Sequence, residues 1–251
     1  MNRKEELAKR IIVALDVGSR EEALLLIGQL EDVEIFKMGL RLFTAEGPSL
    51  LNEIKTSRKK VFLDLKLHDI PNTVAGAVKV AVRYGVHMLT LHSSGGREMM
   101  ERAADAAKEE AEKEGTEKPL LLAVTVLTSL KSEQLHEIGI TSDPARQVIK
   151  LAKLAREAGA DGLVCSPQEI EIVKQEIGKD FLVVAPGIRP SWAAAQDQKR
   201  IMTPSLAFQK GADYLVIGRP IIEAASPQKA FLRIVEESDH AYYSSDNKNS
   251  I

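Results

Sequence analysis

A short apolar run rich in β-branched residues, followed by a longer amphipathic run, recurs eight times along this chain. The apolar runs are predicted strands, namely Ile11–Asp16, Val33–Gly39, Val61–Leu67, His87–His92, Leu120–Leu127, Asp161–Ser166, Phe181–Gly187 and Ala212–Gly218. The runs between them are predicted helices, namely Glu21–Leu30, Pro48–Ser57, Pro71–Tyr84, Glu98–Glu114, Ser132–Ile138, Pro144–Ala158 and Gln168–Ile177. Eight strand–helix units in about 240 residues predict a single α/β domain, a (β/α)8 or TIM barrel.

An open, doubly wound parallel sheet is the alternative fold, because alternation alone does not say whether a sheet closes. The number of strands and the chain length favour the barrel. No G-x-G-x-x-G follows the first predicted strand, which weakens the dinucleotide-binding version of the open sheet. We expect the catalytic barrel to span residues 1–237, and the polar, aperiodic residues 238–251 to form a frayed tail.

Charge and cysteine content narrow the class of protein. The 34 basic and 36 acidic side chains leave a net charge of −2, so the chain has no positive excess with which to hold a nucleic acid. The single cysteine cannot form an internal disulfide, which predicts a reducing compartment and a cytoplasmic protein. The N-terminus lacks the apolar stretch of a signal peptide, and the longest apolar run, Leu120–Leu127, is too short to span a membrane.

Charged residues occur at the ends of three predicted strands, where a barrel interior is normally apolar. Asp16 ends the first strand, Lys37 lies in the second, and Asp64 and Lys66 lie near the end of the third. Side chains two apart in a strand share a face, so Asp64 and Lys66 are expected to point together into the barrel mouth. Asp69 follows at the junction with the next helix. Both signs of charge on neighbouring strands favour a functional site over a structural coincidence.

Each of these charges also has a purely structural interpretation. Asp16 and Asp69 could cap helices, Lys37 could extend its ammonium to solvent, and Asp64 and Lys66 could form a structural ion pair. A buried ion pair is costly to desolvate, however, and is weak evidence for a role in stability.

The charge of Lys66 decides which chemistry this arrangement favours. An opposite charge about 4 Å away contributes on the order of 4 kcal/mol at an effective dielectric near 20. Beside Asp64 and Asp69, Lys66 is therefore expected to stay protonated, whereas a Schiff-base lysine needs a free amine. The arrangement predicts a proton donor.

A phosphate site is expected at the loops that follow the seventh and eighth strands. The first of these loops, Pro186–Pro204, runs to nineteen residues, a length typical of a lid or binding loop. The second begins with Gly218, which lets backbone N–H groups approach a ligand, and Arg219, which supplies a bidentate donor. These features predict a phosphorylated small molecule as substrate.

Metal and thiol chemistry are poorly supported by the sequence. His87 and His92 are expected on opposite faces of one strand, and the remaining histidines have no ligand-like partner. Cys165 is expected to be a small buried hydrophobic residue. No motif for pyridoxal phosphate or thiamine binding is present. No metal and no cofactor are therefore predicted.

The third strand and the segment after it read FLDLKLHDIPNTV, which contains the string D-x-K-x-x-D-I-P-N-T. This string resembles the signature of the orotidine 5'-phosphate decarboxylase family. IIVALDV, FKMGLRLF, VTVLTS, PGIRP and VIGRPI match other landmarks of that family in order, over roughly residues 10–237. No motif position departs from the family pattern.

The resemblance implies a cofactor-free, homodimeric barrel that converts orotidine 5'-phosphate to UMP and CO2, the last step of de novo pyrimidine synthesis. It implies that Lys66 protonates C6 of the pyrimidine, that Asp64 lies against the substrate carboxylate, and that Lys37 and Asp69 complete the charge network. It implies the following binding roles: Asp16, Lys37 and Thr73 at the ribose, Thr128 and Ser129 at the pyrimidine, Gln198 between base and phosphate, Gly218 and Arg219 at the phosphate, and Arg189 in the closing loop. Asp69 and Thr73 are expected to reach into the active site of the neighbouring subunit.

The residues and the resemblance agree on the chemistry. Loss of CO2 from a ring carbon leaves a localised carbanion, which fixed electrostatics and a nearby ammonium can stabilise. Two alternatives remain. One is a metal-dependent sugar-phosphate decarboxylase on the same scaffold, such as 3-keto-gulonate-phosphate decarboxylase, and the other is a barrel that binds nucleotides as a sensor without turnover.

Overall fold

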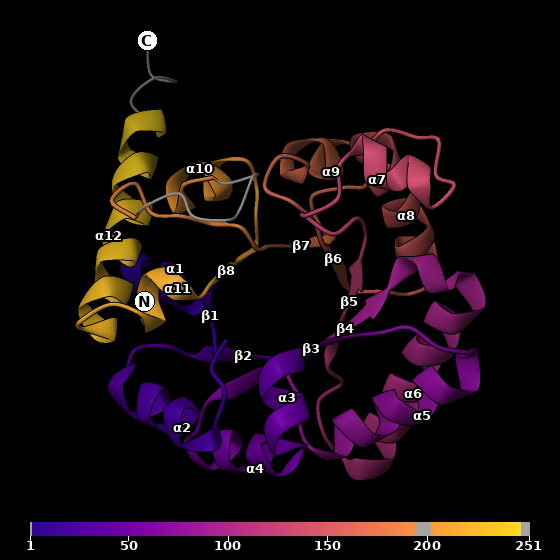
Figure 1. Cartoon of the computed structure of the whole chain (residues 1–251), viewed down its shortest axis with the longest axis horizontal. Helices are drawn as coiled ribbons and strands as arrows, with labels where there is room; N and C mark the ends of the chain where they lie inside the picture. Colours follow the sequence, from indigo (N-terminus) through magenta and orange to yellow (C-terminus); the bar gives the residue numbers. More distant parts are fainter. Residues whose placement is uncertain (1, 194–201, 247–251) are drawn as a thin grey trace.

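The structure is a computed structural model that describes residues 2–193 and 202–246. Eight parallel strands close into a barrel in the order of the sequence (Figure 1). They are β1 (Ile11–Ala14), β2 (Ile35–Gly39), β3 (Lys60–Leu67), β4 (Met88–His92), β5 (Leu120–Val124), β6 (Gly162–Val164), β7 (Leu182–Ala185) and β8 (Tyr214–Ile217). The pairing of β8 with β1 closes the ring. The predicted (β/α)8 barrel is therefore confirmed, and the open sheet is excluded.

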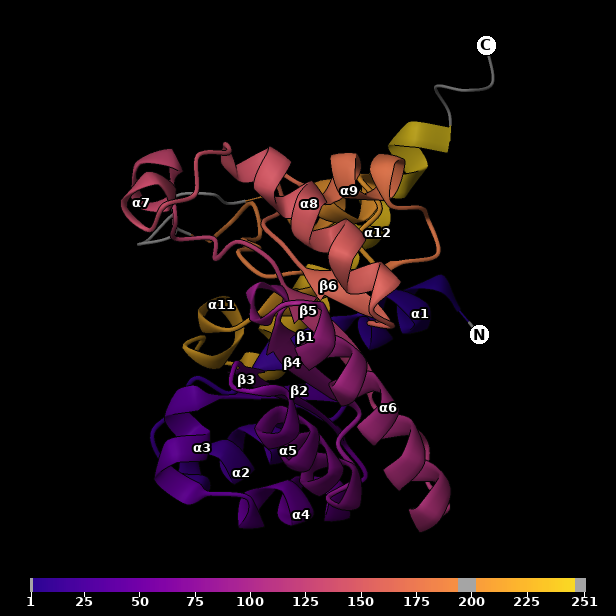
Figure 2. The same ribbon diagram turned by 90° about the vertical axis from the view of Figure 1, so that its right-hand side faces the viewer.

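Helices surround the ring of strands (Figure 1). They are α1 (Arg3–Lys9), α2 (Arg20–Gln29), α3 (Leu40–Glu46), α4 (Ser49–Thr56), α5 (Pro71–Arg83), α6 (Arg97–Glu114), α7 (Ser132–Glu137), α8 (Pro144–Glu157), α9 (Ile170–Glu176), α10 (Pro204–Gln209), α11 (Arg219–Ile222) and α12 (Pro227–Asp246), with a 3-10 turn at Ser93–Gly95. In the side view, α3, α7 and α11 lie on one side of the barrel, and α1 lies on the other (Figure 2). The side with α3, α7 and α11 holds the carboxyl ends of the strands, because α3 begins directly after β2 and α11 begins two residues after the end of β8.

The barrel has two apolar layers, one outside the strands and one inside. The outer layer packs the strands against the helices. The inner layer is a ring of buried side chains, one or two from each of seven strands: Ile12, Ala14, Ile35, Phe62, Met88, Leu122, Val184 and Val216. Side chains two positions further along each strand lie above this ring, on the same face. The next inward layer, toward the carboxyl ends, therefore contains Asp16, Lys37, Asp64, Thr90 and Val124.

Five helices were not predicted from the sequence: the long helix α12 and the four short helices α1, α3, α10 and α11. The four short helices have only four to seven residues, too few for a helical period to stand out from the surrounding pattern. Most strands are also shorter than predicted: β2 and β4 begin later, and β1, β5, β6, β7 and β8 end one to three residues earlier.

The expected tail after Glu237 is wrong as far as the structure describes it. Helix α12 continues to Asp246, and Ser238 and Asp239 are buried. The hydroxyl of Ser238 donates to the carbonyl of Ile234 at 2.8 Å, and Asp239 lies 3.5 Å from the guanidinium of Arg3. The buried positions follow the same helical stripe as the preceding apolar residues, so polar side chains continue a face that the hydrophobic pattern alone would have ended.

Candidate active site

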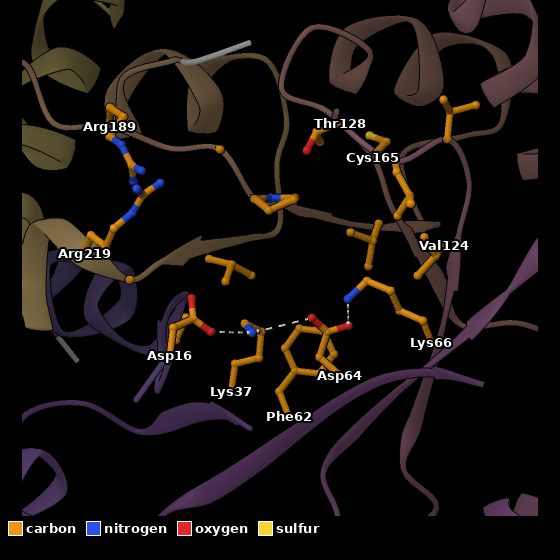
Figure 3. Close-up of a pocket in the computed structure, with 18 residues that line it drawn as sticks. Asp16, Lys37, Phe62, Asp64, Lys66, Val124, Thr128, Cys165, Arg189 and Arg219 are labelled. Atoms are coloured by element: carbon orange, nitrogen blue, oxygen red, sulfur yellow. Dashed lines mark hydrogen bonds and ion pairs between the residues drawn. The ribbon is translucent and has the colours of Figure 1, made fainter. Parts of the chain in front are cut away.

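A cavity of about 260 Å³ opens at the carboxyl ends of the strands. Its walls combine apolar side chains of the barrel interior with ionic groups from β1, β2, β3 and the loops after β7 and β8 (Figure 3). The lining residues that carry polar groups are Asp16, Lys37, Asp64, Lys66, Thr128, Cys165, Arg189 and Arg219. This end of a (β/α)8 barrel is where active sites of the class occur.

Four ionic side chains form a row of alternating charge along one wall (Figure 3). The ammonium of Lys37 lies 3.3 Å from Asp16 Oδ1 and 3.6 Å from Asp64 Oδ2. The ammonium of Lys66 lies 2.9 Å from Asp64 Oδ1. We refer to these four residues as the charge row. Because each carboxylate is beside a lysine, the row places two ammonium groups in the cavity without an uncompensated buried charge.

Asp64 is the centre of the charge row and its most constrained member. Its side chain is 13% exposed, and burial alone would raise its pKa. The charges of Lys37 and Lys66, with hydrogen bonds from Lys66 and Thr90, outweigh burial and hold the pKa of Asp64 below its ordinary value. Asp64 is therefore ionised at neutral pH.

The backbone of β3 departs from regular strand geometry at Lys66. Its φ of +53° lies in the left-handed region, which costs a residue with a side chain about 1–3 kcal/mol. The pairing with β4 is regular at Leu63↔Leu89 and again at Leu67↔Leu91, so a bulge lies between these pairs. Bulges of this kind redirect side chains at barrel rims. Lys66 and Asp64 contact one another and both line the cavity, as expected from the sequence.

Close packing at the end of β2 explains the glycine there. A Cβ on Gly39 would lie 2.9 Å from the ammonium of Lys37, so any larger residue would displace this amine. Gly39 is also the first residue before α3, where the chain turns away from the barrel.

Two arginines lie across the cavity from the charge row (Figure 3). Arg189 follows β7 and is 6% exposed, and Arg219 is the first residue of α11 after β8. Their guanidinium groups point toward one another at the rim (Figure 3). The structure therefore brings Arg189, Gly218 and Arg219 to the end of the cavity where a phosphate was expected.

Not all predicted site residues line this cavity. Thr128 does, but Ser129 is exposed and outside the lining set. Asp69 and Thr73 are exposed and also outside it, and Gln198 lies beyond the described residues. Asp69 does not cap α5 either: the residue before the helix is Ile70, whose N–H donates to Asp69 Oδ1 at 2.6 Å.

Cys165 is buried as expected, at 1% exposed, and burial raises the pKa of its thiol. The structure brings together two histidines that the sequence left unpaired: the rings of His68 and His92 are 5.4 Å apart between centroids. Within residues 2–193 and 202–246, no group of three or more His, Cys, Asp or Glu side chains is placed to hold a metal ion.

One polar residue of the site was missed by sequence reasoning. Thr90 is fully buried, accepts a hydrogen bond from the Lys66 N–H at 2.9 Å and donates one to Asp64 Oδ1 at 3.0 Å. Its position two residues after the inward-facing Met88 is the signal that could have identified it.

The fold is a closed (β/α)8 barrel, and its strand ends hold a row of alternating charges opposite two arginines. These features define an enzyme of the (β/α)8-barrel class. Residues 9–234 match the sequence model described as "Orotidine 5'-phosphate decarboxylase / HUMPS family". The chain therefore belongs to this family.

Individual relatives agree with this assignment. The chain is 51% identical over 229 residues to the orotidine 5'-phosphate decarboxylase of Nostoc sp., covering 91% of this chain and 96% of that protein. It is 52% identical over 238 residues to the protein of the same name from Pelobacter propionicus, covering 94% and 98%. The crystal structure of orotidine 5'-phosphate decarboxylase from Lactobacillus acidophilus superimposes with a TM-score of 0.82 at 38% identity, covering 92% and 99%.

Proposed function

We propose that this enzyme decarboxylates orotidine 5'-phosphate to UMP and CO2, with the Lys66 ammonium as the proton donor and no metal or cofactor. The observation that carries the proposal is the charge row, which lies across the cavity from Arg189 and Arg219. Such a cavity suits a ligand with a dianionic phosphate at one end and a reacting carboxylate at the other.

The phosphate end supplies binding energy far from the reacting bond. The guanidinium groups of Arg189 and Arg219 can hold phosphate oxygens with charge-assisted hydrogen bonds. Binding energy gained there can hold the pyrimidine carboxylate against ionised Asp64, a contact that is unfavourable by itself. Departure of CO2 relieves this repulsion.

The proton transfer follows from the position of Lys66. The bond between C6 and the carboxylate carbon breaks, CO2 leaves without the electron pair, and the pair stays on C6. An Nζ–H proton of Lys66 then moves to C6, leaving a neutral amine that regains its proton from solvent. The second ammonium, Lys37, adds fixed positive charge in the same wall, so stabilisation of the carbanion requires no reorganisation of the site.

The coordination of Asp64 favours this chemistry over the metal-dependent sugar-phosphate alternative. Asp64 Oδ1 already accepts from Lys66 and Thr90, and Oδ2 faces Lys37. A divalent cation bound to Asp64 would have to displace an ammonium and would lie beside two positive charges.

We further propose a homodimer in which Asp69 and Thr73 act in the neighbouring subunit's site. Both residues are exposed and lie outside the cavity of their own chain. Ile70, between them, is an apolar side chain left 66% exposed, and a second subunit would cover it.

Among the described residues no helix is both long and apolar enough to cross a bilayer. We place the reaction in the cytoplasm, which suits the unpaired buried thiol of Cys165.

The direct test follows the absorbance of orotidine 5'-phosphate with purified protein that has been treated with EDTA. We expect the substrate to be consumed, with equal amounts of UMP and CO2 formed and no response to added Mg²⁺. Activity that depends on added metal would support the sugar-phosphate alternative. Tight binding of UMP without turnover of substrate would support the sensor.

A further inference from the structure

We propose that Thr90 is a positioning residue for this reaction: its one hydroxyl holds both the Lys66 backbone and the Asp64 carboxylate in their active arrangement. The inference rests on the proposed function. It concerns a residue on β4 that contributes no group to the cavity lining.

The first observation is the register of the β3 bulge. Between the pairs Leu63↔Leu89 and Leu67↔Leu91, β3 contributes residues 64, 65 and 66, and β4 contributes only Thr90. The backbone groups of β4 are therefore too few to satisfy this part of β3 by regular ladder hydrogen bonds. The Lys66 N–H instead donates to a side chain, the Oγ1 of Thr90, at 2.9 Å.

The second observation is the other hydrogen bond of the same hydroxyl. Thr90 Oγ1 donates its only proton to Asp64 Oδ1 at 3.0 Å. The same Asp64 Oδ1 also accepts a hydrogen bond from the Lys66 ammonium at 2.9 Å. The Thr90 hydroxyl thus contacts both ends of the bulge: the carboxylate of Asp64 at its start and the backbone amide of Lys66 at its end. The left-handed backbone at Lys66 is kept by contacts that include this one.

The third observation is that the Thr90 hydroxyl is shielded from solvent. Its side chain is fully buried in the layer above Phe62 and Met88. A threonine side chain is branched at Cβ and has few rotamers, so the hydroxyl is held in one orientation. Loss of the hydroxyl would leave the Lys66 N–H without this partner and would remove one of the hydrogen bonds that keep Asp64 ionised.

Two matched pairs of variants isolate the hydroxyl. Thr90→Val keeps the branched shape of threonine and replaces the hydroxyl by a methyl group. Thr90→Ser and Thr90→Ala both lack the methyl group of threonine, and only the serine keeps the hydroxyl. We expect kcat to fall on the order of 10- to 100-fold in Thr90→Val and Thr90→Ala, with a smaller change in KM, because the substrate still binds but Lys66 is misplaced. We expect Thr90→Ser to stay within about threefold of the wild type.

The pH profile separates positioning from packing. The titratable groups around Asp64 are Lys37 and, beyond it, Asp16, together with Lys66 on its own strand and His92 on β4, which is itself beside His68. All of these remain in the variants. Without the Thr90 hydroxyl, the pKa of Asp64 rises, so the acid limb of kcat/KM moves to higher pH in Thr90→Val and Thr90→Ala, and does not move in Thr90→Ser.

Amide hydrogen exchange gives a readout that needs no activity. The Lys66 N–H should exchange slowly in the wild type and in Thr90→Ser, and faster in Thr90→Ala. If Thr90→Val does not fold, the serine and alanine variants decide the question. Equal activity and equal exchange in Thr90→Ser and Thr90→Ala would overturn the proposal. Wild-type protein that fails to consume orotidine 5'-phosphate would overturn the proposed function instead, and the exchange comparison would still test the role of Thr90.

Discussion

Asp64 shows how a single residue sets the chemistry of its neighbours. Its two oxygens contact Lys66, Thr90 and Lys37, so both lysines and the bulge of β3 meet at one carboxylate. A buried carboxylate with only one partner would tend to take up a proton. Asp64 is kept ionised by the positive charges of Lys37 and Lys66. Asp64 in turn places a negative charge 2.9 Å from the ammonium of Lys66, the group proposed as the proton donor.

At the residue scale, Lys66→Ala should abolish most of the activity and leave the protein folded. A positioned proton donor contributes roughly 10²–10⁴-fold, and Lys66 lies at the cavity wall instead of in the apolar layers. The measurement is kcat/KM, with circular dichroism as the check on folding. Lys79→Ala is the matched control, because Lys79 pairs with Glu109 between outer helices. Turnover of Lys66→Ala at the rate of this control would falsify the proton-donor role.

We expect His92 to make the free energy of unfolding depend on pH. Burial lowers its pKa, and the nearby charges of His68 and Lys66 lower it further, against an opposing effect of Asp64. As pH falls below about 6.5, the unfolded chain takes up this proton before the folded chain does, so the free energy of unfolding decreases. Part of that decrease should be absent in His92→Asn.

Urea denaturation near pH 7.5 and near pH 5.5 measures this effect. His136→Asn is the control, because His136 is exposed on α7. The interpretation fails if the stability of His92→Asn decreases between the two pH values as much as that of the wild type and the control.

At the element scale, the bulge of β3 and the length of α12 both depart from what the hydrophobic pattern predicts. The bulge of β3 follows from its pairing with β4, and no residue between Leu63 and Leu67 is a glycine that would announce it. Helix α12 continues beyond its apolar residues because Ser238 and Asp239 occupy the buried stripe. The bulge thus depends on β4, and Asp239 of α12 contacts Arg3 of α1.

Removal of residues 238–251 should destabilise the protein. It deletes the buried residues Ser238 and Asp239, and with them the Ser238 hydrogen bond and the Asp239–Arg3 contact with α1. Losses of this kind amount to about 1–3 kcal/mol, which lowers Tm by roughly 3–10 °C in a domain of this size. Calorimetry measures the change, and removal of residues 247–251 alone is the control. Equal Tm values for the two truncations would show that residues 238–246 contribute nothing to stability.

At the scale of the whole molecule, closure of the barrel assembles the site from the two ends of the chain. Pairing of β8 with β1 brings Gly218 next to Asp16, so that Arg219 and the charge row line one cavity. A shared dimeric site would extend this assembly to a second chain, since Asp69 and Thr73 are exposed and lie outside the lining of their own cavity.

Mixing two inactive variants tests the shared site. In a hybrid dimer of Lys66→Ala and Asp69→Asn subunits, one site carries both substitutions and the other carries neither. Random exchange at equal amounts should therefore restore about a quarter of the wild-type activity. The measurement is activity after subunit exchange, with hybrids verified by mass spectrometry. Hybrids that remain inactive would show that Asp69 acts within its own chain.

The sequence by itself determined the fold and the place of the charges. The alternation of short β-rich and longer amphipathic runs is a local pattern, and it correctly predicted eight strands in a closed barrel. The period of two within each strand is equally local, and it correctly placed Asp64 and Lys66 on one side.

Only the tertiary structure decided how these residues are held. The bulge at Lys66, the hydroxyl of Thr90 between two site residues, and the buried polar end of α12 all depend on contacts between elements. Such contacts join residues far apart in the chain, and their geometry depends on strand register and packing, which the order of residue types does not specify. Patterning therefore set which side chains face the cavity, and the closed barrel set what each of them touches.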